Sequence, residues 1–118
     1  MPNEAGKTIR IEFTPTFKRN LKALAKKYRH IRSDVQPIIE QLQSGAVLGD
    51  QVPGVGYAIF KVRVRNRDIQ KGKSSGYRMI YYLRTSDTII LITIYSKLDQ
   101  GDISPQRIRQ IIREMQGA

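Results

Sequence analysis

The sequence predicts a single α+β domain over residues 8–118, with the element order β-α-α-β-β-β-α, preceded by a flexible N-terminus at residues 1–7. Two patterns predict it: apolar residues alternate with polar ones in four segments, and they recur every three or four residues in three others. Since the last three strands follow one another through short connections, we expect a mostly antiparallel, twisted sheet. The N-terminal helical hairpin should cover one face, and the C-terminal helix should pack at an edge or on the other face.

The first strand and the first helix are expected between residues 8 and 28. The alternation over 8–13 predicts a strand with three inward side chains, Ile9, Ile11 and Phe13. Thr14 suits the N-cap of a helix, and Pro15 suits its first position. The helix should bury one stripe, made of Phe17, Leu21, Leu24 and Tyr28.

A second helix is expected to begin near Ser33 or Asp34, either of which can cap it, and to run to Ser44. This start places Pro37 in the first turn, where proline is tolerated, and Gly45 is a plausible stop. The buried stripe should consist of Val35, Ile38, Ile39 and Leu42. Residues 45–56 are rich in glycine and predict a loop.

Three strands and one helix should complete the chain. The strands are predicted near 60–65, 76–84 and 88–97, with a basic loop at 66–75 and a tight turn at 85–87. Ser104 and Pro105 repeat the cap pattern of the first helix and predict a helix start. Its apolar face should be Ile108, Ile111, Ile112 and Met115.

The net charge of +11 is unevenly placed. Residues 7–32 hold nine Lys or Arg against one acid, and residues 61–97 hold nine against two. An uneven distribution of positive charge favours a phosphate backbone or an acidic protein as partner. The chain has no cysteine, no signal-peptide pattern and no apolar run long enough for a membrane span, so we expect a cytoplasmic protein without membrane contact.

Most catalytic arrangements are excluded by residue content. His30 is the only histidine and the acids are scattered, so the sequence predicts no metal site, no catalytic triad and no paired-carboxylate hydrolysis. The stretch 72–74 resembles the end of a phosphate-binding P-loop but lacks its first glycine and a following helix. We therefore expect no small-molecule cofactor.

Cationic side chains gather on the predicted sheet. Lys61, Arg63 and Arg65 occupy every second position and should share one face, and Arg78 and Lys97 lie on the next two strands. Tyr82 and Tyr95 fall near these cations, whereas Tyr77 and Tyr81 have the parity of the core. The cations could simply solvate an open sheet face, but the run 61–67 contains no acid. This favours an anion-binding site for nucleic acid, with RNA as the expected ligand.

These motifs resemble those of the RelE/ParE superfamily of type II toxin–antitoxin toxins, specifically its RelE- and HigB-like mRNA interferases. The resemblance covers residues 8 to about 116. It rests on the element order and on four segments: 60–65 (FKVRVR), 72–82 (GKSSGYRMIYY), 93–97 (TIYSK) and 102–104 (DIS).

The resemblance implies a RelE-like fold and an endoribonuclease that enters the ribosomal A site and cuts bound mRNA by attack of a 2′-hydroxyl on the adjacent phosphate. It implies that Lys61 and Arg63 hold the phosphate or assist proton transfer and that Arg78 stabilises the phosphorane. Tyr95 and Lys97 would serve as acid, base or stacking partner. Supporting RNA contacts would come from Arg65, Lys73 and Tyr82.

The resemblance also implies two partners, a small acidic or amphipathic antitoxin that covers the basic face, and the ribosome with its mRNA. It leaves the catalytic acid and base unassigned. Two other functions stay open: inhibition of DNA gyrase without nuclease activity, as in the ParE branch of the same fold, and RNA binding without catalysis.

Overall fold

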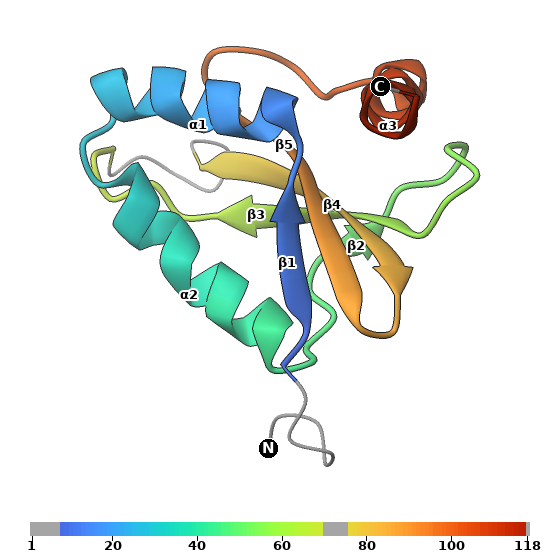
Figure 1. The fold of residues 1–118 in the computed structure, drawn as a ribbon. Coiled ribbons are helices and arrows are strands. Elements are labelled where there is room, and N and C mark those ends of the chain that lie inside the picture. The colour runs from blue at the N-terminus through green and yellow to red at the C-terminus, as the bar shows by residue number, and fades with distance from the viewer. Residues whose placement is uncertain (1–7, 70–75, 118) are drawn as a thin grey trace.

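The computed structural model describes residues 8–69 and 76–117 (Figure 1). The N-terminus at residues 1–7 and the proposed RNA contact Lys73 lie outside this part of the chain. No helix in the described ranges is long and apolar enough to cross a membrane. The elements, in chain order, are β1 (Arg10–Phe13), α1 (Pro15–Lys27), α2 (Ile31–Gln43), β2 (Asp50–Gln51), β3 (Ile59–Val64), β4 (Tyr77–Thr85), β5 (Thr88–Ser96) and α3 (Pro105–Gln116).

The strands form one sheet in the order β1-β5-β4-β3-β2. Within the described residues, β1 pairs with β5 in parallel and the other three strand pairs are antiparallel, which confirms the prediction of a mostly antiparallel α+β sheet. The short strand β2 lies inside the segment predicted to be a loop, where Asp50 pairs with Lys61 and Gln51 with Phe60. The long hairpin of β4 and β5 therefore forms the centre of the sheet.

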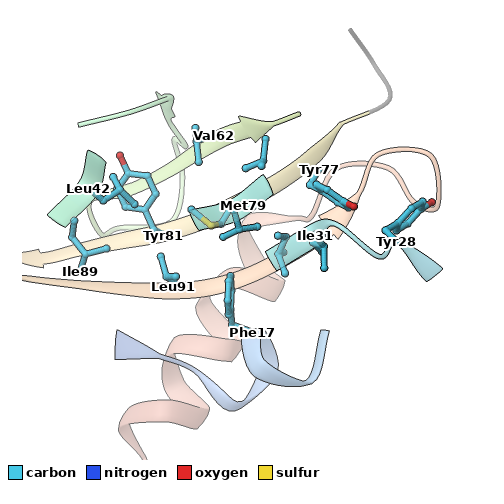
Figure 2. Packing of buried hydrophobic residues seen from close by; sticks show 13 residues of the cluster. Phe17, Tyr28, Ile31, Leu42, Val62, Tyr77, Met79, Tyr81, Ile89 and Leu91 are labelled. Carbon is cyan, nitrogen blue, oxygen red and sulfur yellow. The ribbon is translucent and has the colours of Figure 1, made fainter. Parts of the chain in front are cut away.

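The helical hairpin covers one face of the sheet and α3 packs on the other, which is one of the two placements predicted for the last helix (Figure 1). Between the hairpin and the sheet lies the larger cluster, to which β4 contributes Tyr77, Met79 and Tyr81, all fully buried (Figure 2). The two tyrosines are thus core residues, as predicted. The smaller cluster joins α3 to the opposite face through Ile108, Ile111 and Ile112.

Two helices begin where the sequence predicts. The Thr14 hydroxyl accepts a hydrogen bond from the Phe17 amide at 2.9 Å and donates one to the Ile92 carbonyl at 2.6 Å. The first bond caps α1, and the second fixes the start of α1 to β5. The Ser104 hydroxyl caps α3 by accepting a hydrogen bond from the Arg107 amide at 3.1 Å.

The predicted start of α2 was wrong. This helix begins at Ile31 with His30 at the N-cap, and neither Ser33 nor Asp34 caps it. The reason is a contact far away in sequence, because Asp68 accepts a hydrogen bond from the His30 amide at 3.0 Å and lies 2.7 Å from the His30 ring nitrogen Nδ1. Asp68 thereby satisfies the amide of the N-cap residue, which has no partner within the helix.

Two further predictions fail as a result of local geometry. Because α2 begins early, Pro37 lies inside the helix, past the first turn. Its side chain is exposed to solvent. Phe13 was expected to point inward, yet 40% of it is exposed, since it ends the edge strand β1. Its ring packs on Phe17 with 5.6 Å between ring centroids, while Ile9 and Ile11 pack against the core as predicted.

Candidate functional site

Two of the predicted cations form one row across the sheet with Tyr95. Arg63 of β3 pairs with Arg78 of β4, and Arg78 pairs with Tyr95 of β5. Side chains that lie directly opposite each other on neighbouring strands point to the same face. This is the face on which α3 packs, since the adjacent residues Val62, Met79 and Ile94 belong to the core under the helical hairpin. The row therefore brings two guanidinium groups together at one end of the α3 face.

The two predicted lysines meet at a carboxylate that the sequence prediction had not used. Lys97 Nζ lies 2.9 Å from Asp102 Oδ1, and Lys61 Nζ lies 3.6 Å from the same oxygen. Lys61 belongs to β3, two residues from Arg63, whereas Lys97 directly follows β5 and Asp102 lies in the connection to α3. Side chains from three parts of the chain thus converge on one point.

Asp102 is held in its ionised form. The hydrogen bond from Lys97 and the positive charges of Lys61 and Lys97 lower the pKa of Asp102 below its ordinary value of 3.8. The Asp102 side chain is 57% exposed, against 34% for Lys61 and 29% for Lys97. The cluster is therefore open to solvent, with the carboxylate more exposed than either lysine.

Gly76 allows the strands to approach closely at this site. A Cβ atom at Gly76 would lie 2.6 Å from the Val64 carbonyl oxygen and 3.5 Å from Arg63 Nε. The first distance is too short for any other residue, and the second shows that the Arg63 side chain passes beside this glycine. The Gly76 carbonyl also accepts a hydrogen bond from the Lys97 amide at 3.0 Å, which extends the β4–β5 ladder and fixes the position of Lys97.

Tyr95 is buried, which differs from what its predicted role as an acid, base or stacking partner requires. Only 4% of the residue is exposed, and among the described residues no protein atom makes a hydrogen bond of normal geometry with its hydroxyl. Burial raises the pKa of Tyr95, and this effect outweighs the neighbouring Ile103 amide, which favours the ionised form. A pocket of about 210 Å³ borders the ring, lined by Thr16, Asn20, Thr93, Gln100, Ile103, Arg107 and Ile111.

The remaining predicted RNA contacts lie apart from this cluster. Arg65 is exposed just past β3, where it borders a separate pocket beside Ser33 and Pro37 of α2. Tyr82 is on the α3 face but packs with the apolar cluster of α3, and its ring lies 5.3 Å from that of Tyr57. The structure thus brings Lys61, Arg63, Arg78 and Lys97 together and leaves Arg65 and Tyr82 outside.

Asp102 is the site residue that sequence reasoning missed, because the segment 102–104 (DIS) served only as part of the family resemblance and Asp102 was given no role in the site. Asp99 forms an ion pair with Lys27 of α1 at 2.8 Å, and Asp102 forms the pairs with Lys61 and Lys97. A signal was present in the sequence. Two acids follow the last strand directly, next to a predicted sheet face that carries several cations.

A second basic surface lies on the helical hairpin. The five cations of α1 are all exposed, and the helix contains no acid. Like charges four residues apart on a helix repel each other, so this surface costs some stability instead of adding to it. Its members are Lys18, Arg19, Lys22, Lys26 and Lys27.

The four clustered cations can bind an anion with several oxygen atoms, and the geometry alone does not identify that anion. A comparison with known families narrows the choice. Residues 11–100 match the family described as "ParE toxin of type II toxin-antitoxin system, parDE".

Proposed function

The chain belongs to the ParE toxin family of type II toxin–antitoxin systems, and we propose that this toxin is a ribosome-dependent endoribonuclease that cleaves mRNA during translation. A toxin of this class has a cognate antitoxin as its partner. Toxins with different targets share this fold, so family membership alone does not choose the target. The proposal depends on the chemistry of the cation cluster, which we define as Lys61, Arg63, Arg78 and Lys97.

The observation that supports the proposal most is the pairing of Arg63 with Arg78, with Lys61 two residues away on the same face and Lys97 beside them. Cleavage of RNA by its own 2′-hydroxyl passes through a phosphorane that carries more negative charge than the starting phosphodiester. Positioned positive groups stabilise that charge, and loss of one such group typically lowers the rate by about 10²–10³.

The bonds that form and break in this reaction involve neither a water molecule nor a metal ion. The 2′-oxygen forms a bond to phosphorus, the bond from phosphorus to the 5′-oxygen breaks, and one proton passes in net terms from the 2′-oxygen to the departing 5′-oxygen. The products are a 2′,3′-cyclic phosphate and a 5′-hydroxyl. Because arginine remains protonated at any physiological pH, Arg63 and Arg78 act through charge and positioning and leave the proton transfers to other groups.

The basic surface of α1 supports the requirement for the ribosome. A cluster whose paired side chains are 29–57% exposed gains much from a substrate that a second macromolecule already holds in place. Lys27 is paired with Asp99, and the other exposed cations of α1 suit the phosphate backbone of ribosomal RNA, with binding that weakens as salt increases; these are Lys18, Arg19, Lys22 and Lys26.

Inhibition of DNA gyrase is the second candidate function. The match to a ParE family favours it, and so does the burial of Tyr95, since a gyrase inhibitor needs no exposed acid or base on its sheet. This candidate requires no catalytic use of the cation cluster.

A brief induction of the toxin in cells distinguishes the two candidates. We expect new mRNA 5′ ends inside translated codons within minutes, and we expect Arg78→Ala to lower their abundance by at least roughly 100-fold. Arg84→Ala is the matched control, because Arg84 is an exposed arginine at the other end of β4, and it should cleave like the parent chain.

The other outcomes contradict the proposal. Intact messages together with trapped gyrase–DNA complexes would identify the gyrase inhibitor. Intact messages with stalled translation and no gyrase complexes would identify a toxin that binds RNA without cleaving it. If a folded Arg78→Ala variant cleaved mRNA at the parental rate, the cation cluster would not be part of the mechanism.

A further inference from the structure

One carboxylate oxygen, Asp102 Oδ1, is shared by the ammonium groups of Lys61 and Lys97. We propose that Asp102 occupies the position that a phosphodiester of the RNA takes on binding, so that Asp102 is an internal competitor of the substrate. The inference rests on the proposed function for the identity of the anion. The two lysines then form a phosphate subsite, and binding begins with an exchange of one anion for another.

The exchange is chemically balanced. A carboxylate and a phosphodiester each carry one negative charge, and oxygen atoms of both accept charge-assisted hydrogen bonds from lysine at about 2.7–2.9 Å. The 2.9 Å contact of Lys97 with Asp102 lies in this range. When a phosphate replaces the carboxylate, the two ammonium groups stay paired. Asp102 loses its two ion pairs, and this loss is partly offset by hydration of a carboxylate that is already 57% exposed.

The segment that carries Asp102 is held weakly enough to exchange. It belongs to the connection between β5 and α3, and a Cβ atom at the neighbouring Gly101 would meet no other atom within 4 Å. The contacts that tie it to the cations are ion pairs with partly exposed side chains, and pairs of this kind contribute little to stability. The subsite is therefore accessible without unfolding of the sheet.

A catalytic base is the alternative role for Asp102, and the two roles predict opposite results for Asp102→Asn. As a competitor, Asp102 weakens RNA binding, so the asparagine variant binds more tightly and still cleaves. As a base, Asp102 is needed for chemistry, so the variant binds RNA as before and cleaves far more slowly.

The test measures the affinity of the full chain for a short fluorescent RNA with 2′-O-methyl groups, which the reaction cannot cleave. We expect Asp102→Asn to lower Kd by about three- to tenfold, from the usual strength of two exposed ion pairs. Asp99→Asn is the matched control. It removes the same charge from the same segment, but Asp99 pairs with Lys27 and not with the lysines of the subsite. It should change Kd by less than about twofold.

A double-mutant cycle tests whether the effect passes through the lysines. In a Lys97→Ala background the gain from Asp102→Asn should shrink markedly, because the carboxylate then competes for one lysine instead of two. Equal Kd values for the Asp99→Asn and Asp102→Asn variants would overturn the inference, as would an undiminished gain in the Lys97→Ala background.

Cleavage of ribosome-bound mRNA is measured separately on the same proteins. If Asp102→Asn tightens binding while even the parent chain cuts nothing, the phosphate subsite stands and the endoribonuclease proposal falls. If the parent chain cuts mRNA while Asp102→Asn and Asp99→Asn bind alike, the endoribonuclease stands and the subsite falls.

Discussion

The hydroxyl of Tyr81 anchors the loop that precedes β2, and its removal should destabilise the protein measurably. This hydroxyl donates a hydrogen bond to the Leu48 carbonyl at 2.6 Å and accepts one from the Leu48 amide at 2.9 Å. Tyr81→Phe deletes both bonds and leaves two backbone groups that are partly buried without these partners. At roughly 0.5–1.5 kcal/mol for each bond, the free energy of unfolding should fall by about 1–3 kcal/mol.

Tyr77→Phe is the matched control. Tyr77 lies on the same strand, is equally buried, and in the described part of the chain its hydroxyl has no hydrogen-bond partner. Burial, with smaller contributions from the carboxylates of Asp34 and Asp68, raises the pKa of this hydroxyl and keeps it neutral. Tyr77→Phe removes a buried hydroxyl that has no partner among the described residues, so the free energy of unfolding should stay the same or rise.

Urea unfolding followed by circular dichroism measures both variants, with the slope of the transition as a check that the denatured state is unchanged. The difference between Tyr81→Phe and Tyr77→Phe is the quantity that tests the reasoning. Equal losses of stability in the two variants would refute it, because both lose the same atom from the same core and only one loses hydrogen bonds.

Three further predictions concern the framework of the site. Gly49→Ala should lower the free energy of unfolding by at least ~2 kcal/mol in urea, because Gly49 has a φ of +80° and a Cβ atom there would overlap the Lys61 backbone. Gly45→Ala is the control: a Cβ atom at Gly45 meets open space, so its loss of stability should be smaller. Thr14→Ala should cost about 1–2 kcal/mol in the same assay, since it deletes the cap of α1 and its bond to β5, and a loss below about 0.3 kcal/mol would contradict that role. The hydrogen bonds from His30 lower the pKa of Asp68 below its ordinary value of 3.8, so its stabilising contribution is complete above that pH and disappears as the pH falls through the lowered value. Asp68→Asn should therefore flatten the decline of stability below about pH 4, and an unchanged pH profile would contradict this.

The sequence predicted best what local chemistry determines. Thr14 and Ser104 cap their helices through residues three positions away, and both were found from sequence alone. The alternation in β3 correctly placed Lys61 and Arg63 on the face opposite Val62, and the same parity rule identified Tyr77 and Tyr81 as core residues. These features depend on neighbours within a few residues or on strand periodicity.

What the sequence could not predict depends on contacts between distant residues. The start of α2 was misplaced because the amide of His30 is satisfied by Asp68, 38 positions later. The burial of Tyr95 comes from the segment that follows it and from α3, which no pattern within β5 reveals. Likewise, nothing near Asp102 in the sequence indicates Lys61, whose distance along the chain is bridged only by the fold.

The decisive substrate is an mRNA with a single 2′-deoxynucleotide, bound to purified ribosomes. We expect the all-ribose message to be cut to a 2′,3′-cyclic phosphate and a 5′-hydroxyl, and we expect no cut where the 2′-hydroxyl before the scissile phosphate is missing. Cleavage at the deoxy position, or products that carry a 3′-hydroxyl and a 5′-phosphate, would contradict the proposed mechanism.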